Sequence, residues 1–313
     1  MRVFVTGATG FVGRWLSRDL TAAGHLVLTP VTSDGRRVDV RDADALRGTL
    51  AALPPEAIVH LAAIASATEA AHNATDALAV TVGGTVNLLE VVLTLPDQPH
   101  VIVVASSEVY GNPRAEELPL REAAALRPET PYALSKVAQE AVAMAYARRL
   151  RSSLVVVRPF NHTGPGQRPS FVVPAVARRV LDLQTGRATD IPVGNLDVRR
   201  DFSDVRDVAR AYRLLVEALA SGRIERGGVV LNVASGAAVS IRRIVELLAA
   251  AAGVEPVMRV DPELVRASDP AEVRGDASAL RALTGWRPEI PLSQTLSDVW
   301  DEAAGSVAAQ PLA

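Results

Sequence analysis

The chain has 313 residues, a formal net charge of −2 and no cysteine. This length fits one large domain or two closely packed ones, and the near-neutral charge excludes a basic surface for nucleic acid or anionic membrane. The absence of cysteine excludes a disulfide framework, a thiolate nucleophile and iron–sulfur ligation.

Short apolar runs alternate with longer helical patterns through the first half of the chain. Arg2–Thr6 predicts a strand rather than a signal peptide, and an amphipathic helix is expected from Phe11 to Ala23. The apolar run from Ala79 to Leu95 contains Asn87 and Glu90, which favours a buried helix over a membrane span. Further strands are expected at 25–29, 57–61, 100–105 and 153–158. Apolar strands separated by helices predict an α/β fold with a doubly wound parallel (Rossmann) sheet.

The residue pattern changes after Pro159. A Gly- and Pro-rich segment precedes an expected helix at 171–183, another helix is expected at 205–221, and a strand at 229–233 should return to the first sheet. We therefore expect a dinucleotide-binding domain at 1–163 plus 205–236 and a smaller α/β substrate-binding domain at 164–204 plus 237–303. Residues 304–313 are predicted to form a flexible tail.

A glycine-rich string lies directly between the first strand and the first helix. Glycines at this junction permit a tight turn, the approach of backbone N–H groups to a pyrophosphate, and close packing of helix on strand. The pattern predicts a dinucleotide site, with a plain structural turn as the alternative. Its residues are Gly7, Thr9, Gly10, Phe11, Val12 and Gly13.

The residues after the second strand bear on the choice between NAD and NADP. That strand ends at Thr29–Thr32 without a carboxylate, and Arg36 and Arg37 follow. Guanidinium groups suit a 2′-phosphate, so the sequence favours NADP(H), with NAD(H) as the second candidate. The alternative is that these arginines only keep a loop soluble.

Tyr132 and Lys136 stand one helical turn apart, so their side chains share a helix face. An ammonium beside a phenol favours the phenolate, and we expect Lys136 to lower the pKa of Tyr132. Ser106 follows the fourth strand, at the end of a parallel sheet where ligands bind. Chance supplies a Tyr–Lys pair on many solvated helices, but its joint occurrence with Ser106 and the glycine loop favours proton transfer at a carbonyl.

These motifs resemble the extended short-chain dehydrogenases/reductases, most of which act on nucleotide sugars, and the resemblance covers nearly the whole chain. It implies Ser106, Tyr132 and Lys136 as catalytic residues, with Lys136 also holding the nicotinamide ribose. One departure is Thr81, where relatives commonly have Asn. The resemblance adds the cofactor-binding residues Asp39 and Val40 at the adenine, Leu61, Ala62 and Ala63 after the third strand, and Pro159.

The second half supplies candidates for binding the sugar nucleotide. In the family, residues matching Asn161, Arg200 and Arg266 contact the diphosphate, and arginine forks suit phosphate oxygens. Ordinary surface ion pairing is the alternative for the arginines, and a local hydrogen bond is the alternative for His162. The full expected set is Ser107, Asn161, His162, Val172, Asn195, Arg200 and Arg266. The histidines lack metal-ligand spacing, and no metal site is predicted.

Asn161-His162 and the Gly194–Asp197 segment resemble the GDP-mannose branch, and within it the GDP-4-keto-6-deoxy-D-mannose reductases, which make GDP-D-rhamnose. Glu108 keeps a second reading open, because the matching glutamate in dehydratases of the superfamily removes the C5 proton. A GDP-mannose 4,6-dehydratase and a nucleotide-sugar 4-epimerase therefore remain alternatives, and a non-catalytic NADP-binding protein is a more remote one. The resemblance implies a homodimer paired through the helix of Tyr132. We expect a cytoplasmic protein that takes a GDP-linked 6-deoxy-4-ketohexose and binds neither nucleic acid nor membrane.

Overall fold

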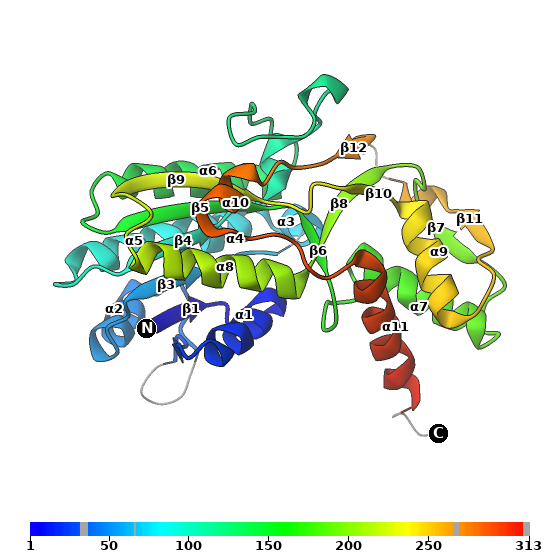
Figure 1. The fold of residues 1–313 in the computed structure, drawn as a ribbon, viewed down its shortest axis with the longest axis horizontal. Coiled ribbons are helices and arrows are strands. Elements are labelled where there is room, and N and C mark those ends of the chain that lie inside the picture. Colours follow the sequence, from blue (N-terminus) through cyan, green and yellow to red (C-terminus); the bar gives the residue numbers. More distant parts are fainter. Residues whose placement is uncertain (32–36, 66, 266–268, 309–313) are drawn as a thin grey trace.

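The computed structural model describes residues 1–31, 37–65, 67–265 and 269–308. Its central element is a parallel sheet of six strands in the order β2–β1–β3–β4–β5–β9 (Figure 1). This confirms the predicted α/β fold with a doubly wound parallel sheet. The strands are β1 (Arg2–Thr6), β2 (Leu26–Leu28), β3 (Ala57–His60), β4 (His100–Val104), β5 (Ser153–Pro159) and β9 (Gly227–Val233).

Both faces of this sheet are buried, which explains why its strands read as nearly continuous apolar runs. Val3 and Val5 of β1 belong to a core shared with α1 and α8, whereas Phe4 between them belongs to a core shared with α2, α5 and α6. The helices around the sheet are α1 (Phe11–Ala22), α2 (Ala43–Ala52), α3 (Ala67–His72), α4 (Ala74–Leu78), α5 (Gly84–Thr94), α6 (Pro131–Ala147), α8 (Val205–Ala220) and α10 (Ser278–Thr284).

A π-helical turn, Ala79–Gly83, joins α4 to α5. The resulting helical stretch, Ala74–Thr94, is long and apolar enough to cross a membrane by length and composition, and 44% of its most apolar window is buried inside the protein. Leu88 and Val92 of this stretch lie in the core beneath β3 and β4. These residues pack in the core of the protein, as the prediction of a buried helix at 79–95 expects.

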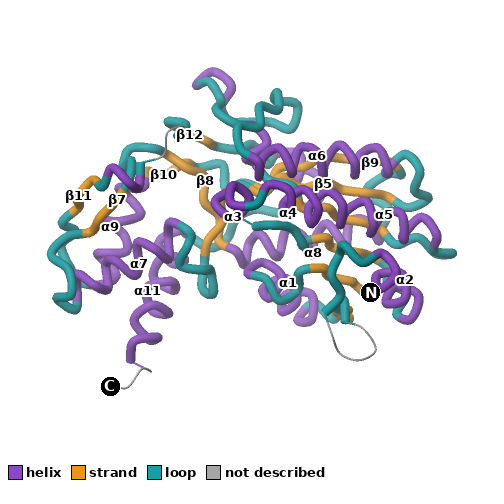
Figure 2. Tube along the Cα trace, turned by 180° about the vertical axis from the view of Figure 1, so that it is seen from behind, coloured by secondary structure: helices purple, strands orange, loops and turns teal. Residues whose placement is uncertain are grey.

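A second region lies to one side of the sheet in Figures 1 and 2. Its core is formed by the apolar faces of α7, α9 and α11, the last of which contributes Trp300, together with strand residues such as Phe202. Its helices are α7 (Val172–Gln184), α9 (Ile241–Ala252) and α11 (Leu292–Ala308), and its strands are β6 (Asn161–Thr163), β7 (Ile191–Val193), β8 (Arg199–Asp204), β10 (Ala238–Ser240), β11 (Met258–Val260) and β12 (Glu272–Val273).

Three features differ in detail from the expected boundaries. β6 pairs with β8 of the second region, and Leu280 and Trp286, which follow residue 237, pack in the core of the first sheet. α11 continues to Ala308, past the expected start of the tail at residue 304, because Ala303 and Ala304 pack against the second core. The two regions thus exchange more segments than composition suggested.

Short 3₁₀ turns lie at Ser107–Tyr110, Ala115–Glu117 and Pro262–Leu264. The chain runs from β1 outward to β2 and then returns to β3 on the other side of β1, so the order reverses between β1 and β3. Open α/β sheets bind ligands at such a reversal, outside the carboxyl ends of the strands. The glycine-rich string and the residues after β3 both leave the sheet at this point.

Candidate functional site

The glycine loop between β1 and α1 is shaped by two glycines that no other residue could replace without a shift. Gly7 adopts a left-handed backbone (φ +70°), and a Cβ on Gly13 would lie 2.2 Å from the Gly7 carbonyl oxygen. The Gly10 N–H donates to that same oxygen at 2.9 Å. The turn therefore brings the N-terminus of α1, with its unpaired backbone N–H groups, to the reversal of the sheet, where such groups suit a pyrophosphate.

The other residues of the loop divide between the core and the surface. Thr9 is exposed, Val12 packs against the core of the first sheet, and the ring of Phe11 stacks on His162 at 6.1 Å between centroids with 4° between the planes. This stacking joins a predicted cofactor residue to a predicted substrate residue. His162 also has the local hydrogen bond considered as its alternative, between Nδ1 and the Phe160 carbonyl oxygen at 3.0 Å.

The segment after β3 lies against the glycine loop. A Cβ on Gly7 would approach the Ala62 nitrogen to 3.0 Å, and the Ala62 N–H donates to the Thr6 hydroxyl at 3.1 Å. Leu61 and Ala63 flank this contact and are partly buried, as a surface that a bound nucleotide covers would be. Pro159 is buried at the end of β5.

Asp39, predicted at the adenine edge, has a partner that sequence reasoning missed. Its carboxylate accepts from the Arg41 backbone N–H at 2.9 Å and from the Arg41 guanidinium at 2.6 Å, and these bonds lower the pKa of Asp39. Val40 is buried. Arg37 is exposed in a bridge to Val31, and Arg36 lies outside the described residues.

Ser106, Tyr132 and Glu108 come together at the end of β4. The Ser106 hydroxyl accepts from the Glu108 N–H at 3.1 Å and hydrogen-bonds the Tyr132 phenol. Tyr132 stands on the first turn of α6, which begins there because Thr130 caps the Ala133 N–H at 3.1 Å and Pro131 occupies the first helical position.

Lys136 is 3% exposed and lies one turn further along α6. Its ammonium donates to the Val104 carbonyl oxygen at 2.8 Å and to Gln139 Oε1 at 3.0 Å, and its Nζ is 6.0 Å from the centre of the Tyr132 ring. Gln139, which follows Lys136 by three residues, was not singled out in the sequence. The spacing of one helical turn was the available signal.

The electrostatics of the pair differ from the sequence-based prediction. Burial raises the pKa of Tyr132, the nearby Glu108 carboxylate raises it further, and only the hydrogen bond from Ser106 opposes the change. The expectation that Lys136 lowers the Tyr132 pKa is therefore wrong for this structure. Burial also lowers the pKa of Lys136 to about 7. Burial disfavours both charged forms, and the phenol stays in the protonated form that can give a proton to a developing alkoxide.

The substrate-side candidates are more dispersed. Ser107 is buried in the 3₁₀ turn beside Ser106, Asn161 is exposed at the start of β6, and Val172 is 39% exposed at the start of α7. Asn195 accepts from the Asp197 N–H at 3.2 Å in its own turn. These contacts do not by themselves gather the residues around one ligand.

Arg200 is held by the segment around residue 269. Its guanidinium pairs with the Asp269 carboxylate and donates to the Pro270 carbonyl oxygen at 2.7 Å. Arg266 lies outside the described residues. Asp201, which sequence reasoning missed, is 1% exposed and accepts from the Ser235 and Gly275 N–H groups at 2.8 and 3.1 Å. It therefore fixes β8, and with it Arg200, against two loops of the chain.

A glycine loop at the sheet reversal, with a serine, a tyrosine and a lysine beside it, defines an NAD(P)-dependent extended short-chain dehydrogenase/reductase. Residues 4–299 match the family model described as GDP-mannose 4,6 dehydratase. The chain belongs to this family.

Relatives within the family include both reductases and epimerases. The chain is 38% identical to the GDP-6-deoxy-D-mannose reductase of Pseudomonas aeruginosa, over 94% of each chain. It is 32% identical to a UDP-glucose 4-epimerase of Mycolicibacterium smegmatis, over 95% of this chain and 96% of the relative. The solved structure of RMD from Pseudomonas aeruginosa complexed with NADPH superposes with a TM-score of 0.88 at 34% identity, covering 97% of this chain and 99% of that one.

Proposed function

We propose that the protein reduces the C4 ketone of GDP-4-keto-6-deoxy-D-mannose with NADPH and yields GDP-D-rhamnose. The observation that carries the proposal is the half-buried Tyr132, hydrogen-bonded to Ser106 at the carboxyl edge of the sheet, where burial and Glu108 raise the pKa of its phenol. The 38% identity to a GDP-6-deoxy-D-mannose reductase and the likeness to a structure complexed with NADPH support the choice of substrate and cofactor.

The chain fits a dinucleotide because Gly7 and Gly13, where a Cβ would meet backbone atoms at 3.0 and 2.2 Å, keep the turn before α1 tight and leave the N-terminus of the helix open to a pyrophosphate. The glycine loop, Asp39 with Val40, the 61–63 segment and Pro159 would hold it, and the exposed Arg37 would meet a 2′-phosphate. When bound, NADPH supplies the hydride. Asn161, Arg200 and Val172, with Ser107, His162 and Asn195, would hold the GDP-sugar.

The chain's own contribution is to move one proton. Ser106 would polarise the C4 carbonyl by a hydrogen bond, and Tyr132 would give its proton to the C4 oxygen. The alcohol forms and the phenolate recovers a proton from solvent. Lys136 would hold the nicotinamide ribose through its ammonium.

The test is NADPH consumption with the purified keto-sugar nucleotide. We expect NADPH absorbance to fall with one GDP-rhamnose formed per NADPH. Tyr132→Phe should abolish turnover and leave NADPH affinity nearly unchanged. The control is Tyr146→Phe on the same helix, which should keep its turnover because the Tyr146 hydroxyl bonds to Glu90 at 2.5 Å, outside the predicted site. Turnover of Tyr132→Phe within a few-fold of the parent would refute the assigned role.

A dehydratase is the second candidate, because Glu108 lies close enough to Tyr132 to raise its pKa and because the matching family model carries that description. Conversion of GDP-mannose without net NADPH loss would establish it in place of the reductase. The identity to a UDP-glucose 4-epimerase adds UDP-glucose to the same assay, and formation of UDP-galactose would favour that third candidate.

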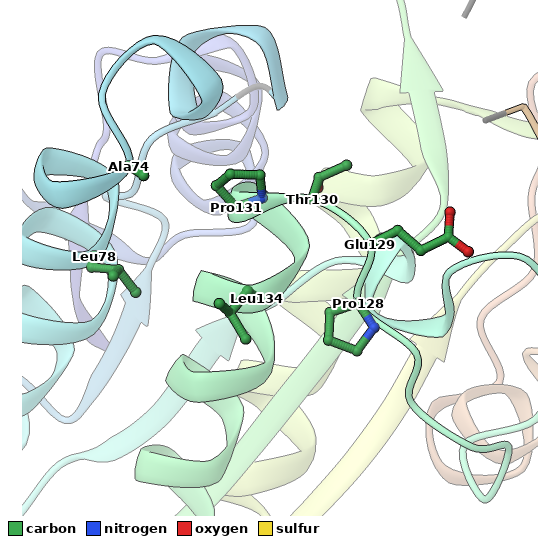
Figure 3. A pocket seen from close by; sticks show the side chains of 7 residues that line it. All are labelled: Ala74, Leu78, Pro128, Glu129, Thr130, Pro131 and Leu134. Carbon is green, nitrogen blue, oxygen red and sulfur yellow. The ribbon is translucent and has the colours of Figure 1, made fainter. Parts of the chain in front are cut away.

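We also propose a cytoplasmic homodimer, in each subunit of which the two predicted domains exchange β6 and the 278–286 segment and α11 extends to Ala308. Leu134 on α6 and Leu78 on α4 are 52% and 41% exposed beside an apolar hollow of about 310 Å³ (Figure 3). None of the predicted site residues lines this hollow, which leaves the surface available to a second copy. Leu134→Glu should convert the dimer to a monomer in light scattering, and an unchanged mass would refute the pairing through α6.

A further inference from the structure

Lys136 is the only lysine of the chain. Its ammonium is buried, so every charge-stabilising contact must come from the protein around it. Within the described residues, two acceptors reach it: the Val104 carbonyl oxygen and Gln139 Oε1. The carbonyl oxygen at position 104 is present whatever side chain that residue carries. The second acceptor depends on the side chain of Gln139, which is fully buried.

Gln139 belongs to a continuous hydrogen-bonded network. Its Nε2 group donates to the Thr85 hydroxyl at 2.9 Å, and that hydroxyl in turn donates to the Thr81 carbonyl oxygen at 2.7 Å. His60 Nε2 reaches the same hydroxyl at 3.0 Å. The π-helical turn, β3 and α6 therefore meet at the side chain of Thr85.

The proton positions in this network have one consistent solution. Because the single hydrogen of the Thr85 hydroxyl goes to a carbonyl, His60 Nε2 must be the donor to Thr85. The other ring nitrogen, Nδ1, then accepts from the Thr6 hydroxyl at 2.8 Å, and Thr6 accepts from the Ala62 N–H. His60 is neutral in this arrangement, and burial together with Lys136 lowers its pKa to about 3.

We propose that Gln139 is the positioning residue of Lys136: its amide holds the ammonium against the end of β4 and, through Thr85 and His60, links it to the Ala62–Thr6 contact at the cofactor loop. The amide orientation is dictated, since only Oε1 can face an ammonium and only Nε2 can face a hydroxyl whose hydrogen is already used. The inference rests on the proposed role of Lys136 at the nicotinamide ribose.

Gln139 is the side-chain contact of Lys136 that a substitution can change. Burial is the cause that lowers the Lys136 pKa. On α6 and the elements packed against it, Glu140 is paired with Arg158 at 2.8 Å and Asp76 with Arg41 at 2.9 Å. The π-helical turn and β9 carry no titratable side chain. Apart from Lys136, the titratable groups on α6 and on the elements packed against it are Glu69, His72, Asp76, Glu90, Glu108, Tyr110, Tyr132, Glu140, Tyr146 and Arg158. His60 of β3 joins the same network through Thr85.

The sole lysine makes a direct measurement available. Protein labelled with NMR-active isotopes at lysine Cε and Nζ gives the signal of Lys136 alone, so its pKa is read without substrate or cofactor. Gln139→Glu should raise that pKa by about one unit or more, a tenfold higher proton affinity, because a carboxylate replaces the amide oxygen. Gln139→Met should lower it by about one unit, because the acceptor is lost.

NADPH affinity, measured by fluorescence titration, gives the second readout. Gln139→Met should weaken binding several-fold because the ammonium is no longer fixed beside the ribose. Thr85→Val should do the same by releasing the amide, while Thr85→Ser, which keeps the hydroxyl, should restore parental binding. Gln184→Met, whose amide donates to the Ala252 carbonyl oxygen in the second region, controls for loss of a glutamine hydrogen bond.

An unchanged Lys136 pKa in both Gln139 variants, with correct folding shown by circular dichroism, would overturn the proposal. If Gln139→Met fails to fold, the comparison of Thr85→Val with Thr85→Ser decides, and equal NADPH affinity in the two would also overturn it. The lysine signal needs no turnover. A failure to reduce the keto-sugar would therefore refute the proposed function and leave this test standing.

Discussion

Replacing Lys136 by methionine should change how the stability of the protein depends on pH. The lysine is 3% exposed, and burial lowers its pKa from an ordinary 10.5 to about 7. At about 1.4 kcal/mol per pH unit, this difference corresponds to roughly 5 kcal/mol of unfolding free energy that the parent lacks when the lysine is charged. Methionine has a similar length and carries no charge to bury.

The sign follows from where the proton is bound. Between pH 7 and 10.5, the unfolded chain keeps the lysine proton and the folded protein has released it, so the stability of the parent rises with pH across this window. Below pH 7 the cost of the buried ammonium is fully present. The advantage of Lys136→Met should therefore be greatest in acid and should shrink by about 1.4 kcal/mol per unit above neutrality. The lost bonds to Val104 and Gln139 lower that advantage at every pH at which the ammonium persists.

The assay is urea unfolding of parent and variant in parallel at several pH values from about 6 to about 9. Taking the difference between the two proteins removes the titration of every group they share. A difference in unfolding free energy that stays constant over this range would show that the Lys136 pKa is not lowered, and the reasoning would fail.

Three other changes test separate parts of the site and core. Gly13→Ala should abolish NADPH binding in a fluorescence titration, because its Cβ would lie 2.2 Å from the Gly7 oxygen, whereas Gly48→Ala, with nothing within 4 Å, should bind normally. Glu108→Gln should lower the pKa of Tyr132, because it removes the charge that raises it. The alkaline limb of the pH–rate profile for ketone reduction should then move toward neutrality, and an unmoved limb would contradict this coupling. Arg158→Met should lower the unfolding free energy by about 3–5 kcal/mol in urea, because it leaves the buried Glu140 carboxylate unpaired. The double variant with Glu140→Gln should recover much of this loss.

Local spacing made the core of the site predictable. The glycines at the first strand–helix junction, and Tyr132 with Lys136 one turn apart, depend on residues that are close in sequence, and strand–helix alternation predicted the parallel sheet. Ser106 could be placed because the end of a strand in such a sheet is a definite position in space. Each of these inferences needs one element or two neighbouring ones.

Long-range contacts account for what the sequence could not reveal. Gln139 bonds to Thr85 of α5, which His60 of β3 also contacts, and the partner of Arg200 lies 69 residues further along the chain. No periodicity connects such residues. The direction of the Tyr132 pKa was mispredicted for the same reason: adjacency to Lys136 is visible in the sequence, but the degree of burial and the approach of Glu108 are not.

The burial that Tyr132 and Lys136 share bears on the direction of the chemistry. Because burial disfavours a phenolate and an ammonium alike, it raises the Tyr132 pKa, which keeps the tyrosine protonated, and lowers the Lys136 pKa to about 7. A protonated tyrosine is ready to donate the proton that reduction of a ketone requires, whereas a reaction that begins by oxidising an alcohol needs the phenolate first. Glu108 strengthens this bias, since its charge raises the Tyr132 pKa further. The carboxylate that would serve as the base of a dehydratase thus also holds its neighbour in the form that a reductase uses.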